Sequence, residues 1–161
     1  MFRCINRLDR DTSGCCLIAK SRYCAGVIGE GLQKTYYAVC EGVPKQEGVI
    51  ELPIGRKPGS IIERECTPGG QYARTEYRLI KTNGRYSLCE VTLKTGRTHQ
   101  IRVHFSAIGH PLAGDDMYGG SLSDIDRQAL HCGRLIFTSP DKGRVTVISE
   151  LPKVMRALLN D

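Results

Sequence analysis

The chain has 161 residues, a length typical of one domain with a sizeable hydrophobic core. It carries 23 Lys and Arg against 17 Asp and Glu, and the net charge of +6 suits an anionic partner, most commonly nucleic acid; the alternative is a merely basic soluble protein. No segment resembles a signal peptide or a membrane span, and the eight cysteines show no Cys-x-x-Cys pair and no regular spacing. We therefore expect a cytoplasmic protein with free cysteines, and neither a zinc site nor a disulfide framework.

The first predicted elements are a strand, a helix and a second strand. Residues 14–20 form a short, continuous apolar run, which predicts a buried strand. Ser21 is a helix-capping residue and Gly31 a helix-ending residue, so a helix is expected between them. Residues 34–41 follow the period of two of a strand, with Tyr36, Ala38 and Cys40 on one face.

The middle of the chain predicts a loop region and then a hairpin. Residues 43–70 are rich in Gly and Pro and should hold at most short strands. Residues 73–81 and 86–93 flank Asn83-Gly84, a dipeptide suited to a two-residue turn with positive φ.

A helix is expected over residues 98–108, because Ile101, Phe105 and Ile108 form an apolar stripe and Gly109 suits its end. The last predicted elements are two strands and a closing helix, over 130–138, 145–149 and 152–159. Strands dominate and several are joined by hairpins. The fold class is therefore α+β with a mainly antiparallel sheet, not a doubly wound α/β fold.

Two distant motifs contain the candidate chemistry. The first, residues 6–14, offers Asp9 and Asp11 in a tight turn, and the second, residues 96–104, is cationic and contains Arg102. A carboxylate held against a distant arginine stays ionised in a shielded site, as a nucleophilic or base-acting aspartate requires. The alternatives are an Asp-rich turn, favoured for Asp11, and a surface arginine lying over apolar side chains.

Other polar residues of these segments have simpler interpretations. Arg97 and Lys94 lie in the loop before the helix, where they suit contacts to phosphate. His99 and His104 are five residues apart, which does not place both on one helical face as metal ligands would require. We expect no metal site, and no Gly-rich nucleotide loop precedes a helix.

The combined motifs resemble those of the RluA-type RNA pseudouridine synthases and cover roughly residues 5–151. The matching segments, in the order of that family, are Arg7-Leu8-Asp9-x-x-Thr12-Ser13-Gly14, Lys34-x-Tyr36-x-Ala38, Thr75-Glu76-Tyr77, Thr95-Gly96-Arg97-x-His99-Gln100-Ile101-Arg102-x-His104, Gly109-His110-Pro111-x-x-Gly114-Asp115 with Tyr118-Gly119, and Gln128-Ala129-Leu130-His131. Each motif alone is weak, but together they are highly specific.

The resemblance implies a curved, mainly antiparallel sheet with a few flanking helices, and isomerisation of uridine to pseudouridine in rRNA or tRNA without cofactor or metal. Carried over by position, Asp9 is the catalytic aspartate, Tyr36 packs on the target base and is a candidate for proton transfer, and Arg102 pairs with Asp9. The residues expected to bind substrate or RNA are Arg7, Arg97, Lys94, Ile101 and His99. The resemblance does not decide between attack at C1′ and addition to the uracil ring.

Two departures from the family pattern affect what we expect. Asn6 stands where many members have His, although Asn also donates and accepts hydrogen bonds. Members usually carry a segment before the first motif, so residues 1–161 are expected to form a single but N-terminally incomplete catalytic domain. Self-association covering the region of residues 15–19, or a poorly active monomer, would follow. The alternatives to the enzyme are a non-catalytic RNA-binding remnant and a small-molecule enzyme.

Overall fold

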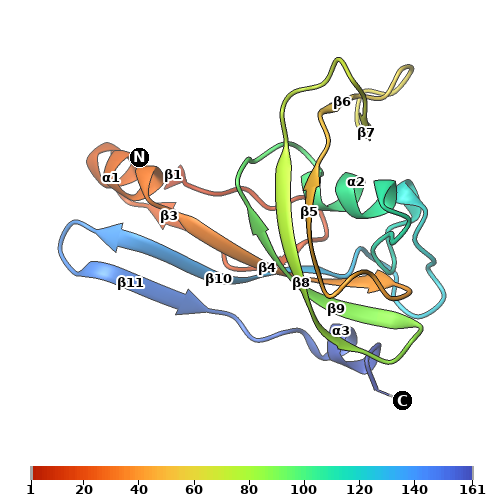
Figure 1. Ribbon diagram of the computed structural model, residues 1–161. Coiled ribbons are helices and arrows are strands. Elements are labelled where there is room, and N and C mark those ends of the chain that lie inside the picture. The colour runs from red at the N-terminus through yellow and green to blue at the C-terminus, as the bar shows by residue number, and fades with distance from the viewer. Residues whose placement is uncertain (1, 161) are drawn as a thin grey trace.

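The computed structural model describes residues 2–160, and its largest element is a seven-stranded sheet (Figure 1). From one edge to the other its strands are β11 (Gly143–Ile148), β10 (Leu130–Ser139), β4 (Gln33–Glu41), β9 (Tyr86–Leu93), β8 (Arg74–Thr82) and β5 (Glu47–Glu51), with β2 (Ser13–Gly14) also pairing with β10. All of these pairings are antiparallel except that of β2 with β10. The α+β, mainly antiparallel prediction is confirmed.

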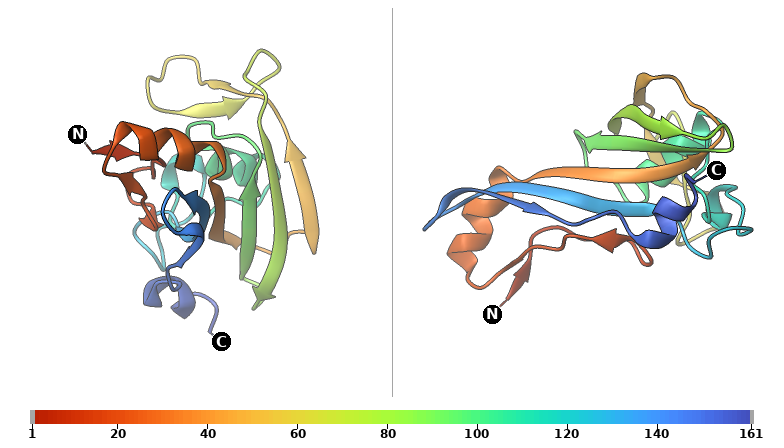
Figure 2. Two further views of the ribbon diagram at one scale, coloured as in Figure 1. Left: turned by 90° about the vertical axis from the view of Figure 1, so that its left-hand side faces the viewer. Right: turned by 90° about the horizontal axis from the view of Figure 1, so that it is seen from below.

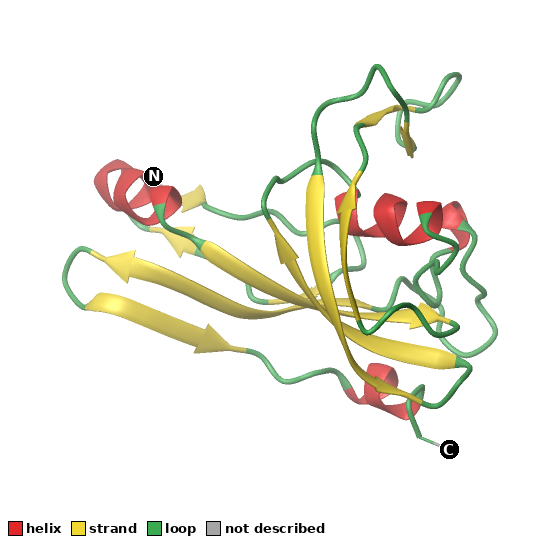
Figure 3. Cartoon of the chain, in the orientation of Figure 1, coloured by secondary structure: helices red, strands yellow, loops and turns green. Residues whose placement is uncertain are grey.

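The remaining elements are short and lie around this sheet (Figure 3). They are the strand pair β1 (Arg3–Cys4) and β3 (Ile18–Ala19), the hairpin β6 (Ile54–Arg56) and β7 (Arg64–Cys66), the helices α1 (Arg22–Glu30), α2 (Gln100–Ala107) and α3 (Lys153–Ala157), and the 3₁₀ helix η1 (Asp116–Tyr118). The β6–β7 hairpin and α3 lie at opposite ends of the molecule (Figure 2). None of the helices over residues 2–160 is long and apolar enough to cross a membrane.

Strand β4 is central and is buried on both faces, which separates two cores. Tyr36 and its same-face neighbours pack in one core with Phe105 of α2. Val39, on the opposite face, packs in the second core with Met155 of α3. The alternation predicted for residues 34–41 is therefore confirmed.

Local capping chemistry explains the first helix, as predicted. The Ser21 hydroxyl accepts a hydrogen bond from Cys24 N–H at 3.1 Å, and α1 ends at Gly31. The expected helix over 98–108 is α2, and Gly109 follows it with φ of 81°. The three elements expected after residue 130 are also present as β10, β11 and α3.

The strand predicted over residues 14–20 is wrong. Only β2 and β3 form there, with two residues each, and Ile18 is 57% exposed. The Asn6 side chain explains the difference, because it hydrogen-bonds Cys15 O at 3.0 Å and Leu17 N at 2.8 Å, groups that a continuous strand would use for its own ladder.

The hairpin of β8 and β9 is confirmed, but its turn differs from the prediction. Residues 83–85 connect the strands, and Gly84 is the turn residue with positive φ, at 88°. Asn83 instead uses its side chain as an anchor. Its Oδ1 accepts from Tyr86 N–H at 2.9 Å and its Nδ2 donates to Leu158 O at 3.1 Å. This side chain thereby ties the turn to the C-terminal segment.

The parallel pairing of β2 with β10 requires a glycine. Gly14 has φ of 111°, and a Cβ on it would lie 2.2 Å from Cys132 O. The positive φ and the close approach of Cys132 O both disfavour any side chain at position 14. This backbone conformation favours glycine, and the Cys132 oxygen cannot move aside without breaking the sheet.

We therefore expect Gly14→Ala to lower the free energy of unfolding by at least about 2 kcal/mol, since strained backbone alone costs about 1–3 kcal/mol. Gly26→Ala is the matched control, because Gly26 lies inside α1 with open space around it, and should stabilise the protein by about 0.5–1 kcal/mol. Urea denaturation measures both. Equal stability of the two variants would contradict this account of Gly14.

Candidate active site

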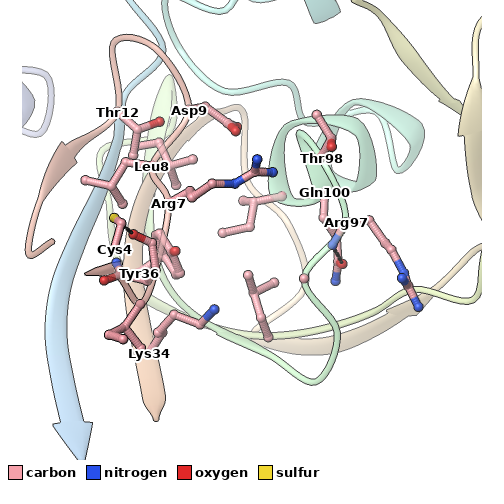
Figure 4. A pocket seen from close by; sticks show the side chains of 16 residues that line it. Cys4, Arg7, Leu8, Asp9, Thr12, Lys34, Tyr36, Arg97, Thr98 and Gln100 are labelled. Atoms are coloured by element: carbon pink, nitrogen blue, oxygen red, sulfur yellow. Dashed lines mark hydrogen bonds between the residues drawn. The ribbon is translucent and has the colours of Figure 1, made fainter. Parts of the chain in front are cut away.

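A cavity of about 500 Å³ lies between the loop after β1, strand β4 and the start of α2 (Figure 4). This volume is in the usual range for sites that bind small molecules or single nucleotides. The residues that line it are Cys4, Ile5, Asn6, Arg7, Leu8, Asp9, Thr12, Lys34, Tyr36, Leu93, Gly96, Arg97, Thr98, Gln100, Ile101 and Leu130. Among the described lining residues Asp9 is the one carboxylate, opposite the cations Arg7, Lys34 and Arg97.

The turn that carries Asp9 is held by the segment just before β10. Thr12 N–H donates to Asp9 O at 3.0 Å and closes the turn. From outside, Gln128 Nε2 donates to the main-chain oxygen of Arg10 and to Thr12 Oγ1. The turn that carries Asp9 is thus held by a residue more than a hundred positions later in the chain.

Asp11 belongs to the turn, as the alternative interpretation of it predicted. It adopts φ of 70°, and its main-chain oxygen accepts from Arg127 Nη1 at 3.0 Å. Its carboxylate pairs with Arg10 Nε at 3.1 Å. Asp11 does not line the cavity, so the two acids of the first motif have different surroundings.

Asn6 anchors the other end of the loop that carries Asp9. The side chain is buried, and both its donor and its acceptor are used in the hydrogen bonds to Cys15 and Leu17 described above. Ile5 N–H also donates to Leu17 O at 2.8 Å. Asn therefore fulfils the expectation that it can both donate and accept at this position.

The buried Gln100 amide fixes the loop before α2. Its Oε1 accepts from Arg97 N–H at 3.0 Å and from Thr95 Oγ1 at 2.8 Å. Its Nε2 donates to Arg74 O and to Thr75 Oγ1, both at 3.0 Å. All four hydrogen-bonding capacities of the amide are satisfied, so the loop that brings Arg97 to the cavity has one well-defined conformation.

The predicted ion pair between Arg102 and Asp9 is wrong in this structure, because Arg102 pairs with Asp115. Nε and Nη2 of Arg102 donate to the two carboxylate oxygens of Asp115, each at 2.7 Å, and the guanidinium lies 4.9 Å from the Tyr118 ring centre. Burial opposes the charge of Arg102, but the Asp115 pair outweighs it and raises the pKa of the guanidinium. Arg102 lies behind the cavity wall and does not line the cavity.

Asp9 nevertheless acts electrostatically on the other proposed catalytic residues. Burial is the main cause that raises the pKa of Tyr36, and the Asp9 charge adds to it. The same charge contributes to the raised pKa of Arg102. Tyr36 is therefore a neutral phenol at physiological pH, beside a carboxylate that makes no ion pair within 4 Å among residues 2–160.

The remaining predicted residues fall into two groups. Arg7, Arg97 and Ile101 line the cavity, and Arg7 extends across it toward α2 (Figure 4). Lys94 and His99 do not line it. Lys94 Nζ lies 3.4 Å from Glu76 Oε2, and His99 Nδ1 hydrogen-bonds the Tyr118 hydroxyl at 2.8 Å. Burial lowers the pKa of His99, so its imidazole is neutral near pH 7.

The sequence predicted no role for Lys34 or Asp115, although both lie in the motifs that resemble those of the RNA pseudouridine synthases. Lys34 points into the cavity from the same face of β4 as Tyr36, and the period of two could have located it (Figure 4). Asp115 is fully buried and holds Arg102. Its position next to a glycine suggests a turn, so nothing in the sequence alone indicates its partner.

The chemistry that the site offers is that of one carboxylate, a neutral phenol and several cations around a partly apolar cavity. Within residues 2–160 no three His, Cys, Asp or Glu side chains are grouped to hold a metal ion. A carboxylate can act as nucleophile or base, and the arginines and lysine suit a phosphate-containing ligand.

Comparison with known proteins identifies relatives over most of the chain. A family model described as RNA pseudouridylate synthase matches residues 1–107. An uncharacterized RNA pseudouridine synthase of Bacillus subtilis, YjbO, is 46% identical over 142 residues, covering 84% of this chain and 50% of the relative. The ribosomal large subunit pseudouridine synthase D of Nitrosomonas europaea is 38% identical over 170 residues, covering 96% and 49%.

A solved structure shares the fold. The human RNA pseudouridylate synthase domain containing 1 protein superposes with a TM-score of 0.81 at 27% identity, covering 93% of this chain and 69% of that one. The chain spans about half the length of the curated relatives it matches.

The Arg102–Asp115 pair generates a stability prediction. Asp115→Asn would leave the buried guanidinium without its counter-charge, and loss of one partner of such a pair costs about 3–5 kcal/mol. We expect a loss of this size in urea denaturation.

Asp11→Asn is the matched control, because it makes the same chemical change in an exposed pair and Asn tolerates positive φ. It should change stability little. If the Asp115 variant unfolded at the same urea concentration as the Asp11 variant, the pair would not be the structural support inferred here.

Proposed function

We propose that this chain, which belongs to the RNA pseudouridylate synthase family, isomerises uridines of structured RNA to pseudouridine with Asp9 as the catalytic carboxylate. The observation that supports this role best is the position of Asp9 as the one carboxylate among the described residues lining a cavity that also contains Tyr36 and three cations. The cavity has room for one flipped-out nucleotide, and its cations suit the flanking phosphates.

The reaction requires that the C1′–N1 bond breaks and a C1′–C5 bond forms. The Asp9 carboxylate would attack or stabilise C1′, or add to the uracil ring, while uracil detaches, turns over and reattaches through C5. C5 loses its proton and N1 ends with one, so substrate and product are isomers. No cofactor or metal enters this scheme.

The walls of the cavity suit the detached base. Tyr36, Ile101 and Leu130 provide an aromatic and apolar surface on which uracil can turn without strong hydrogen bonds. Tyr36 is neutral, so its phenol can donate a proton or relay one, but does not serve as a preformed phenolate base.

The cations would offset the cost of extracting a base from folded RNA. Unstacking and unpairing one nucleotide costs a few kcal/mol, about the size of several phosphate contacts. Arg7 lines the cavity, and we assign it the role of helping to hold the RNA open. We assign Lys34 a phosphate or ribose contact beside the base.

rRNA and tRNA are the candidate substrates, and the name of the Nitrosomonas relative makes large-subunit rRNA the first to test. The alternative, an RNA-binding protein without catalysis, gains support from the pairing of Arg102 with Asp115 instead of Asp9. RNA labelled with tritium at uracil C5 separates the two, because only the isomerase releases tritium to water.

Asp9→Asn should abolish tritium release while RNA affinity stays within about twofold, because a neutral amide can neither attack nor stabilise positive charge at C1′. Asp11→Asn makes the same change two residues away and should retain most activity. Wild-type turnover by the Asp9 variant would rule out this mechanism, and RNA binding by a wild type that releases no tritium would favour the alternative.

Tyr36→Phe should separate the ring from its hydroxyl. We expect RNA affinity to persist, because the ring still packs on the base, and turnover to fall about 10²–10⁴-fold, the usual contribution of a proton-transfer group. Tyr36→Leu should weaken both. Equilibrium binding measures the affinity and single-turnover kinetics measures the turnover. Full turnover by Tyr36→Phe would show that the hydroxyl takes no part in proton transfer and that Tyr36 only lines the cavity.

A further inference from the structure

A second cavity, of about 310 Å³, adjoins the proposed active site on the side of the β6–β7 hairpin. The residues that line it are Ile54, Gly55, Arg56, Arg64, Gly69, Gly70, Gln71, Arg97 and Thr98. Arg97 and Thr98 also line the first cavity, so the two cavities share a wall. From that wall the Arg97 side chain extends away from the Asp9 loop (Figure 4).

This second cavity carries three guanidinium groups, and none of its described lining residues is acidic. Arg56 makes no ion pair and no side-chain hydrogen bond within residues 2–160. Arg97 donates from Nε to the main-chain oxygen of Tyr72 at 3.0 Å, and Arg64 donates from Nη1 to the oxygens of Ile62 and Glu63, also at 3.0 Å each. These carbonyls orient the arginines without neutralising them.

The two acids of the hairpin, Glu63 and Glu65, do not line this cavity and form no ion pair with its arginines among residues 2–160. Glu63 is paired with Lys57, with Oε2 and Nζ 2.7 Å apart. Three like charges that line one cavity repel one another, and an anion bound there reduces that repulsion. The cavity is therefore suited to an anionic ligand.

The hairpin that forms this cavity is held firmly against the rest of the fold. Ile54 and Gln71 exchange two main-chain hydrogen bonds of 2.9 Å, and a Cβ on Gly70 would lie 2.5 Å from Ile54 C. Arg64 N–H donates to the Tyr118 hydroxyl at 3.0 Å, and the same hydroxyl bonds His99 at the start of α2. The second cavity thus keeps a fixed relation to the first.

We propose that the second cavity binds the phosphodiester backbone of the RNA strand that flanks the uridine in the first cavity. The identification of the anion as RNA rests on the proposed function. Guanidinium groups match phosphate oxygens through paired hydrogen bonds, and a strand whose base enters the first cavity passes over the shared wall of Arg97 and Thr98.

The test measures the salt dependence of binding to a fluorescently labelled single-stranded oligouridylate. For single strands, each phosphate contact contributes about 0.7 to the slope of log affinity against log salt concentration. Arg56→Gln should lower this slope by about 0.7, so its affinity changes about fivefold less than that of the wild type over a tenfold rise in salt. Arg56→Lys keeps the charge and should keep the slope.

The control is Arg156→Gln, an exposed arginine on α3 at the opposite end of the molecule (Figure 1). It should leave affinity and slope unchanged.

A second pair of variants avoids removing any arginine. Gly69 lines the cavity and has open space around it, so Gly69→Asp would add a carboxylate beside the cavity and Gly69→Asn a neutral group of the same size. Only the Asp variant should weaken binding.

The proposal is overturned if Arg56→Gln has the same slope as Arg156→Gln, or if Gly69→Asp binds like Gly69→Asn. Failure of the proposed function is a separate result. A wild type that binds the oligouridylate with the expected slope but releases no tritium from labelled rRNA would refute the isomerase and leave this site intact. A wild type that releases tritium, together with an Arg56→Gln variant whose slope is unchanged, would refute this phosphate site and leave the isomerase intact.

Discussion

The position of Asp9 depends on main-chain contacts between the segment that follows it and strand β10. Gly14 lies directly against Cys132 O, and Cys15 N–H donates to that oxygen at 2.8 Å. Gln128, just before β10, holds the main chain of the turn itself. Loops are normally the least constrained parts of a fold, but this one is joined to the sheet by a short parallel strand. The carboxylate that we propose as catalytic is therefore presented by a rigid element, as precise catalysis would require.

The wall of the cavity opposite the Asp9 loop is formed by α2, a helix that carries polar side chains on its buried face. Gln100, Arg102 and His104 are all buried and hydrogen-bonded, and no side-chain nitrogen or oxygen buried within residues 2–160 lacks a partner. Buried polar networks of this kind gain little net stability but penalise every alternative packing. The helix can therefore place Ile101 at the cavity with little freedom to shift, and its Gln100 holds the preceding loop, which places Arg97 between the two cavities.

The sequence correctly predicted the elements that depend on neighbouring residues. Its predictions were wrong where the structure depends on residues far away in the chain. The Ser21 cap and the apolar stripe of α2 depend on neighbouring residues, so α1 and α2 were located correctly. The apolar run after Gly14 was expected to be a strand, but the distant Asn6 side chain takes its main-chain groups. The resemblance pairs Arg102 with Asp9, and spacing cannot show that Asp115, 13 positions after Arg102, lies within reach instead.

The parallel pairing of β2 with β10 also has a kinetic consequence. Ser13 and His131 hydrogen-bond across 118 positions, so almost the whole intervening chain forms one closed loop. Closing a flexible loop of that length costs about 4 kcal/mol of chain entropy beyond a constant. The β8–β9 hairpin closes only a short loop, so its formation costs much less chain entropy. The turn that bears Asp9 should therefore become ordered late in folding, after the central strands provide the edge on which it docks. A motif that comes early in this sequence should therefore be one of the last to reach its final structure.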